Sequence, residues 1–240
     1  NVIQKLPKKI RDKVFIYQQC RDEDKDKVKS FYEQKNIKFD VRTFFSEIYN
    51  NFEKADLIIS EVLSSEFVGE GVRKTAFDAN KRLLKTGAKI IPQSGKIRIS
   101  LVGNNQEVFD ETTVINVNGF DLSKFNAVAR KKVGLALKKK PLLLSKPYDA
   151  FNINLCNNNE ISKEEKILKL KANKDGLCLG IIQWFKVHLY KGIEYENKPG
   201  DHSHWRTPVY LFDEPVMLNA GDILHIRGVL GLDEIWFHKT

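Results

Sequence analysis

Residues 55–70 read ADLIISEVLSSEFVGE, and this stretch sets the expected fold. Its first part is mostly apolar and predicts a strand over residues 56–60. Its second part places three carboxylates on one loop, those of Glu61, Glu66 and Glu70. Open α/β sheets bind ligands at the carboxyl ends of their strands. The stretch therefore predicts a strand that delivers an acidic loop to a binding site.

The chain on either side of this stretch alternates between strand-like and helix-like patterns. Such alternation indicates a parallel sheet with helical crossovers. We therefore expect a partial Rossmann-type domain over residues 1–93. The expected strands are residues 13–17, 38–44, 56–60 and 89–92, and the expected helices are residues 24–34, 46–54 and 72–84.

The pattern changes after Pro92, where apolar and polar residues alternate at every second position. Many strands without long helices between them predict an antiparallel barrel-like domain over residues 94–240. Residues 119–140 look more helical and end at Pro141. The fold class expected is thus a partial Rossmann-type parallel sheet followed by an antiparallel β-barrel-like domain, α+β overall. The expected barrel strands are residues 96–102, 151–155, 166–171, 177–190, 207–212, 223–229 and 234–238.

Composition limits the classes of function. The 240 residues carry a formal charge of +9, but the lysines are spread along the chain and no Arg-aromatic recognition motif accompanies them, so we consider nucleic acid an unlikely partner. No apolar run approaches the roughly 18 residues of a membrane span. Cys20, Cys156 and Cys178 lack Cys-x-x-Cys spacing and predict neither a metal site nor a disulfide framework. We expect a cytoplasmic protein.

The acidic loop has two interpretations. Glu61 and Glu70 are nine positions apart, a spacing that a hairpin-like loop could fold so that both carboxylates face one ligand. Two carboxylates can accept the forked donors of a planar guanidinium and localise its charge on one side. The alternative is a solvated acidic loop that leads into a helix.

Further motifs follow this loop in order along the chain. Over about residues 56–240 the set resembles the protein arginine methyltransferase family, with the double-glutamate loop first and the His-Trp loop late. The matching stretches are EG at 70–71, KTGAKIIP at 85–92, NGFDLS at 118–123, GIIQWF at 180–185, SHW at 203–205 and NAGD at 219–222.

The resemblance implies an S-adenosylmethionine-dependent protein arginine N-methyltransferase that acts on arginine-containing proteins. By that resemblance, Glu61 and Glu70 orient the substrate guanidinium, and His204 and Trp205 complete the pocket. Glu66 is an extra acid, either a salt-bridge former or an element of substrate specificity. A homodimer through an arm near residues 119–141 is also implied.

The chain departs from the family at its N-terminal end. The family's first strand normally ends in a glycine-rich loop that approaches S-adenosylmethionine, and its second strand ends in an acid for the ribose. No G-x-G stands before Asp56, and no carboxylate follows the first expected strand until Asp22. We expect weak cofactor binding, and the cofactor-binding residues are unknown.

Residues 1–60 instead resemble the second Rossmann half of the MurG family of N-acetylglucosaminyltransferases. The matching features include VFIYQQCR at 14–21, VKSFY at 28–32 and FFS at 44–46. A composite chain joined near residues 55–60 and a divergent methyltransferase both remain open. Two other functions stay open as well. One is a fragment of a glycosyltransferase that uses UDP-N-acetylglucosamine, and the other is a non-catalytic dimerising or partner-binding module.

Overall fold

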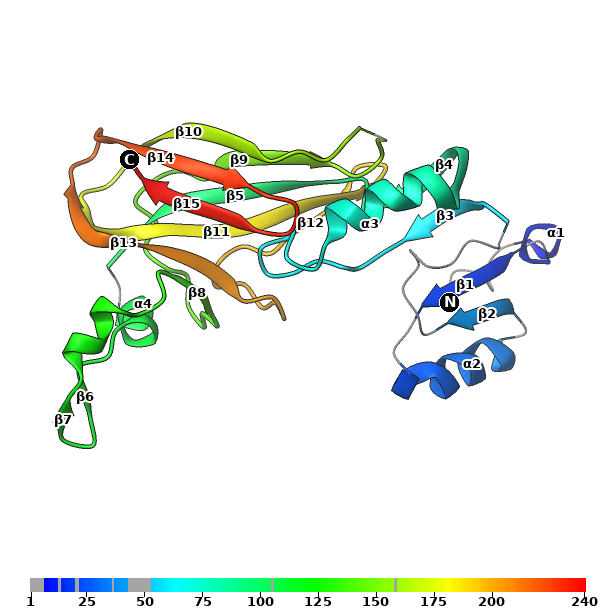
Figure 1. The fold of residues 1–240 in the computed structure, drawn as a ribbon, viewed down its shortest axis with the longest axis horizontal. Coiled ribbons are helices and arrows are strands. Elements are labelled where there is room, and N and C mark those ends of the chain that lie inside the picture. The colour runs from blue at the N-terminus through cyan, green and yellow to red at the C-terminus, as the bar shows by residue number, and fades with distance from the viewer. Residues whose placement is uncertain are drawn as a thin grey trace. The chain divides into compact units, whose positions relative to one another are not determined.

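The computed structural model describes residues 7–12, 14–19, 22–35, 37–42, 53–104, 106–157 and 159–240. The chain forms two compact units, residues 1–53 and residues 54–240, which are described here one at a time. The compact division thus falls after Glu53, and the strand before the acidic loop belongs to the same unit as the barrel (Figure 1). The domain boundary expected at residue 93 remains a prediction.

The first unit contains a parallel pair of strands joined by a helix. The pairing aligns Phe15 with Lys38, and the side chains of Tyr32 and Phe39 stack with ring centroids 5.5 Å apart. The helix expected at residues 46–54 lies almost wholly outside the described residues, as does the end of the strand expected at 38–44. The elements are α1 (Lys8–Arg11), β1 (Phe15–Gln19), the 3₁₀ helix Asp22–Asp24, α2 (Lys25–Gln34) and β2 (Lys38–Arg42).

The second unit opens with the strand, loop, helix and strand that the sequence predicts. Strand β3 (Ala55–Ile59) pairs in parallel with β4 (Leu84–Ile91). Helix α3 (Val72–Asp78) continues into a π-helical turn, Ala79–Leu83, and connects them. Strand β4 begins at Leu84, five residues before the expected start, because Leu84 pairs with Ala55.

Antiparallel strands make up most of the rest of the second unit and confirm the barrel-like architecture (Figure 1). One sheet has the order β8-β13-β11-β5-β9, where β8 is Lys132–Leu135, with β12 beside β11, and a second sheet has the order β10-β14-β15. The strand residues at every second position point inward, so Ile97, Ile99 and Leu101 of β5 are fully buried. The strands are β5 (Ser94–Gly103), β9 (Tyr148–Asn154), β10 (Glu164–Lys171), β11 (Gly176–Tyr190), β12 (Ile193–Glu196), β13 (Thr207–Leu218), β14 (Ile223–Leu230) and β15 (Ile235–Lys239).

The helix expected over residues 119–140 is wrong. The turn at Asn118 and Gly119 has positive φ at both residues, which closes a small hairpin in place of a helix. Farther on, residues 132–135 pair with β13, so a tertiary contact prevails over local propensity. This part contains α4 (Gln106–Thr112), β6 (Asn116–Val117), β7 (Phe120–Asp121), the 3₁₀ helix Ser123–Ala127 and β8 (Lys132–Leu135).

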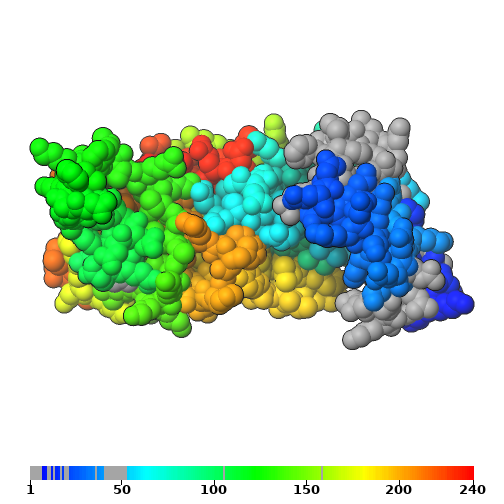
Figure 2. All heavy atoms as spheres, turned by 90° about the horizontal axis from the view of Figure 1, so that it is seen from below, coloured from blue at the N-terminus to red at the C-terminus, as the bar shows by residue number. Residues whose placement is uncertain are grey.

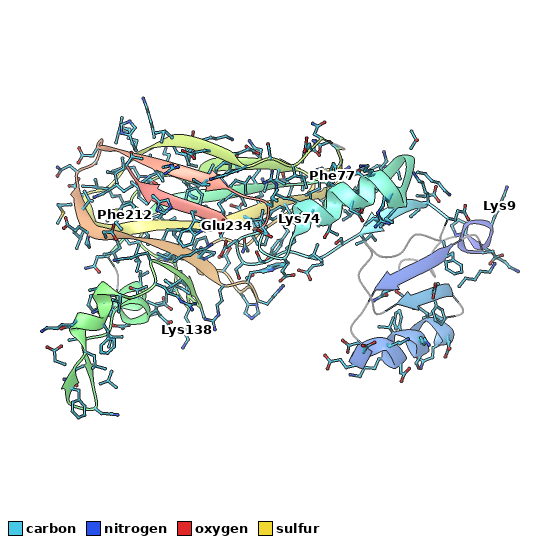
Figure 3. All side chains as sticks on the ribbon, in the orientation of Figure 1. Lys9, Lys74, Phe77, Lys138, Phe212 and Glu234 are labelled. Carbon is cyan, nitrogen blue, oxygen red and sulfur yellow. The ribbon has the colours of Figure 1, made fainter. Side chains whose placement is uncertain are left out.

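Helix α3 is fastened to the β14–β15 end of the barrel. Lys74 projects from its first turn and donates to Asp233 at 2.8 Å, next to Glu234 (Figure 3). Arg73 donates to the carbonyl oxygens of Gly231 and Ser162. These contacts hold the helix that follows the acidic loop.

Within the described parts of the chain, no helix is both long and apolar enough to cross a membrane. The same residues hold no group of three or more His, Cys, Asp and Glu side chains suited to a metal ion. Cys156 is exposed and Cys178 is buried, and both are free thiols, whereas Cys20 lies outside the described residues.

Candidate functional site

The acidic loop, residues 60–71, is shaped by hydrogen bonds of its own. It leaves β3 where the Ser60 amide donates to the carbonyl of Ile91 at 2.9 Å. In its middle, the Ser64 hydroxyl accepts the amides of Glu66 at 3.2 Å and Gly69 at 2.7 Å. A Cβ at position 69 would lie 2.8 Å from that hydroxyl. Glycine therefore permits the sharp fold that returns the loop toward α3.

Phe67 anchors the acidic loop in the barrel. Its side chain is fully buried and meets the ring of Phe185 with centroids 5.6 Å apart. Its φ of 75° is rare for a residue with a side chain, and the buried ring offsets that cost. A Cβ on Gly95 of β5 would come within 2.2 Å of the Phe67 ring. A glycine in the barrel wall thus makes room for the loop.

The His-Trp loop, residues 203–206, lies beside the acidic loop and is bonded to it (Figure 2). The Trp205 indole Nε1 donates to the carbonyl of Leu63 at 2.7 Å, and the Arg206 amide donates to the Ser65 hydroxyl at 3.0 Å. Within the loop, the Ser203 hydroxyl accepts the Trp205 amide at 3.2 Å. Ser203 therefore helps to fix the backbone of Trp205 through its hydroxyl.

Aromatic contacts fix the plane of Trp205. The ring centroid of Phe185 lies 5.1 Å from that of Trp205 in an edge-on arrangement, and the ring of Tyr195 lies 5.7 Å away. The His204 ring lies over the indole at 3.8 Å. Because Phe185 also contacts Phe67, one buried ring supports both loops.

A pocket of about 560 Å³ opens between the two loops. It brings together all five residues that the sequence nominates, although their roles remain predictions. Glu61, Glu70 and His204 are exposed, so their polar groups are free to meet a ligand from solvent. The pocket is lined by Glu61, Leu63, Ser64, Ser65, Glu66, Gly69, Glu70, His204 and Trp205.

Glu66 differs from the other two acids because its carboxylate is already paired. Lys132 of β8 donates to Glu66 Oε2 at 2.5 Å, and the Gln183 side-chain amide donates to the Glu66 carbonyl at 3.1 Å. This is the salt bridge that was one of the two expected roles. Burial, and then the Glu66 charge, raise the pKa of the neighbouring Tyr210 hydroxyl well above its ordinary value.

Sequence reasoning missed the barrel residues that support the loops. Gln183 is a fully buried amide flanked by apolar residues on both sides, and that contrast is a signal of a structural hydrogen bond. Its partners are the Glu66 carbonyl and the hydroxyl of Tyr210, which donates to Gln183 Oε1 at 2.6 Å. Lys132 carries no such signal, since it stands in a run of basic residues.

The arrangement suits a planar cation with several N–H donors. Two exposed carboxylates on one loop can each accept hydrogen bonds from such a group, and charge-assisted bonds of this kind are short and strong. An aromatic side chain beside them adds a flat surface that attracts a cation. A neutral or anionic ligand would leave the two negative charges of the carboxylates unbalanced.

Comparisons with known proteins find similarity to arginine methyltransferases. No family model matches the chain. The chain is similar to an arginine N(omega)-methyltransferase of Streptomyces achromogenes subsp. streptozoticus, with 29% identity over 72% of this chain and 48% of that protein. It is also similar to protein arginine N-methyltransferase 1 of Dictyostelium discoideum, with 23% identity over 74% of this chain and 54% of that protein. The chain thus spans about half the length of these relatives.

A solved structure shares the fold. The Trypanosoma brucei PRMT1 enzyme-prozyme heterotetrameric complex with AdoHcy superposes with a TM-score of 0.76 at 15% identity, over 93% of this chain and 78% of that one. The expected fold class, a Rossmann-like part followed by a β-barrel-like part, is confirmed. These comparisons do not favour the glycosyltransferase or the module interpretation, and they do not address the MurG resemblance. The curated homologues of this chain are protein arginine methyltransferases, which confirms the resemblance that the motifs indicated.

Proposed function

We propose that the chain is a protein arginine N-methyltransferase-like protein whose pocket binds the guanidinium of a substrate arginine. The observation that carries the proposal is the pocket between the two loops, where Glu61 and Glu70 stand free beside Trp205. The similarity to arginine methyltransferases supports the same assignment.

In this proposal Glu61 and Glu70 accept the N–H donors of the guanidinium from one side. Their charges draw the positive charge toward those donors, which leaves the remaining nitrogen more nucleophilic. Trp205 and His204 limit how the side chain enters, so the pocket contributes by orientation more than by proton transfer. The arginine needs no general base while it binds.

S-adenosylmethionine is the cofactor that the similarity suggests, and the Trypanosoma structure contains AdoHcy. The described residues of the first unit do not fit a site of the family's kind. Strand β1 ends at Gln19, and no glycine stands anywhere before Gly69, so no backbone there offers the close approach that a glycine loop allows. We also propose that residues 1–93 form a Rossmann-type domain and that residues 94–240 form a substrate domain.

Calorimetric titration with an arginine-containing peptide tests the assignment. The same peptide with citrulline in place of arginine is the matched control, because citrulline keeps the shape and loses the charge. We expect the arginine peptide to bind at least about 10-fold more tightly, since each charge-assisted hydrogen bond contributes roughly 1.5 kcal/mol or more. Equal binding of the two peptides would show that the pocket does not recognise guanidinium.

We also propose a homodimer formed through the arm, residues 119–141. The Trypanosoma neighbour is a heterotetrameric complex, which is compatible with oligomerisation. The arm exposes large apolar side chains, with Phe120 at 72%, Phe125 at 62% and Val128 at 81%. Exposed apolar surface of this extent is typical of protein interaction sites.

Replacing Phe120 and Val128 by serine should convert the dimer into monomer. Burial of each side chain is expected to contribute roughly 2 kcal/mol, so the double variant should dissociate about 1,000-fold more readily. Sedimentation velocity over a concentration series measures the change. Ile167→Ser on β10 is the control, because Ile167 is 56% exposed and lies outside the arm. A dimer that persists in the arm variant would exclude the arm as the interface.

A further inference from the structure

Lys132 is held among polar and aromatic groups and pairs with Glu66, which lines the pocket. Its ammonium donates to Glu66 Oε2 at 2.5 Å and to the Ile235 carbonyl at 3.0 Å. It lies 4.7 Å from the centre of the Trp236 ring and 5.5 Å from that of Tyr210. The side chains of Lys132 and Glu66 are only 17% and 23% exposed. The ion pair is therefore largely removed from water.

Glu66 is also held through its backbone. Gln183, fully buried in β11, donates to the Glu66 carbonyl at 3.1 Å, and the Tyr210 hydroxyl in turn donates to Gln183. Barrel residues thus hold Glu66 by both its carbonyl and its carboxylate. Glu61 and Glu70, by contrast, are exposed at the two ends of the same loop.

Strand β8 contacts both loops of the pocket. Lys132, its first residue, reaches the acidic loop, while the carbonyl of Gly134 accepts a hydrogen bond from Arg206 of the His-Trp loop at 3.3 Å. The strand itself is fixed by antiparallel pairing with β13, which aligns Lys132 with Tyr210. A side chain on β8 is therefore able to set where the middle of the acidic loop lies.

We infer that Lys132 and Glu66 form a positioning pair that holds the acidic loop, and that Glu66 is not a third ligand for the guanidinium. The inference rests on the proposed function and deepens it. The pocket then offers the charges of Glu61 and Glu70 to the monocationic guanidinium, while the Glu66 charge is balanced by Lys132.

The two interpretations of Glu66 predict opposite effects of Glu66→Gln on peptide affinity when the Lys132 charge has already been removed. Breaking a buried ion pair on one side leaves the other charge unpaired, which costs more than removing both. If Glu66 acts through Lys132, Glu66→Gln harms the intact protein but helps a protein that already lacks the lysine charge. If Glu66 contacts the guanidinium, Glu66→Gln weakens binding in both backgrounds.

The experiment uses four proteins, namely the wild type, Glu66→Gln, Lys132→Met and the double variant. Each is titrated with the arginine peptide, and its urea midpoint is measured. We expect Lys132→Met to weaken peptide binding about 10-fold. The pair is partly buried, so this loss lies between the effect of breaking an exposed ion pair and that of breaking a fully buried one. Adding Glu66→Gln to that variant should recover affinity about 5-fold and raise the urea midpoint.

Lys166→Met is the matched control. Lys166 also combines a carboxylate, that of Glu164 at 3.4 Å, with an aromatic ring, that of Phe151 at 4.8 Å, but it lies on β10, and its partner Glu164, unlike Glu66, does not line the pocket. It should leave peptide affinity unchanged within about 2-fold, in contrast to the Lys132 variant. Lys132→Arg keeps the charge and should retain most of the affinity.

Amide hydrogen exchange supplies a test that needs no ligand. The amides of Phe67 and Gly69 donate within the acidic loop, to the Ser64 carbonyl and hydroxyl. Their exchange should quicken in Lys132→Met and slow again in the double variant. An equal loss of peptide affinity from Glu66→Gln in the wild type and in the Lys132→Met protein would overturn the inference. If the wild type bound no arginine peptide, the proposed function would fail. Amide hydrogen exchange and the urea midpoints would still show whether Lys132 and Glu66 act as a pair that holds the loop.

Discussion

Replacing Glu61 or Glu70 by glutamine is expected to weaken binding of the arginine peptide about 30-fold each. The substitution keeps the size of the side chain and removes the charge that makes its hydrogen bonds to guanidinium strong. A hydrogen bond to a charged group contributes roughly 1.5 to 3 kcal/mol, which corresponds to about 10-fold to 150-fold in affinity. Isothermal calorimetry with the arginine and citrulline peptides measures the loss.

The folded protein should tolerate both substitutions. Glu61 and Glu70 are exposed, and neither is the partner of a salt bridge found among the described residues. The urea midpoints should therefore match that of the wild type. Glu214→Gln is the control for charge alone, because Glu214 is an exposed acid on β13 away from the pocket. Affinity that survives in both pocket variants would exclude these carboxylates as the guanidinium ligands.

Gly95→Ala should damage the site from inside the barrel. The new Cβ would lie 2.2, 2.5 and 2.9 Å from three atoms of the Phe67 ring, and the ring has no free space around it because Phe67 is fully buried. Overpacking a dense core costs roughly 1 to 3 kcal/mol, and this clash is at the upper end. We expect a loss of about 3 kcal/mol in the free energy of unfolding, measured by urea denaturation, and weaker peptide binding.

A second substitution separates the clash from other effects of alanine. Phe67→Leu removes the ring atoms nearest to Gly95, so Gly95→Ala should cost much less in the Phe67→Leu background than in the wild type. Double-mutant cycles measure this coupling directly. Gly192→Ala provides a comparison at a turn glycine where no atom would meet the new Cβ, although its φ of 81° adds strain of its own. Independent, additive losses at Gly95 and Phe67 would contradict the packing account.

The local pattern of apolar and polar residues was sufficient to predict most strands. The strand expected at residues 177–190 is Gly176–Tyr190, and the strand expected at 223–229 is Ile223–Leu230. Alternation of apolar and polar residues is a property of neighbours in sequence, and it marks the one buried face of β14. Strand β11 is buried on both faces over residues 180–185, where a short apolar run indicates the strand instead. Strand β13 extends to Leu218, six residues past the expected end, because its second half pairs with the start of β11.

Residues 119–140 show where local pattern fails. Their apolar residues have mixed spacing, which fits neither a helix nor a strand. Lys132 and Val133 become strand because β13 offers them partners, and Asn118 and Gly119 become a turn because both accept positive φ. The apolar residues between them remain exposed, since no part of their own unit covers them.

The sequence by itself determined most of the strands, the position of the acidic loop after a parallel strand, and five residues that line the pocket, Glu61, Glu66, Glu70, His204 and Trp205. Motifs and periodicity are local, so they can be recognised before the chain folds. Only the tertiary structure decided which partners hold that pocket. Trp205 bonds to a carbonyl 142 positions away, and Lys132 pairs with an acid 66 positions away. Contacts between distant residues depend on strand register and barrel closure, which leave no mark in the neighbouring sequence.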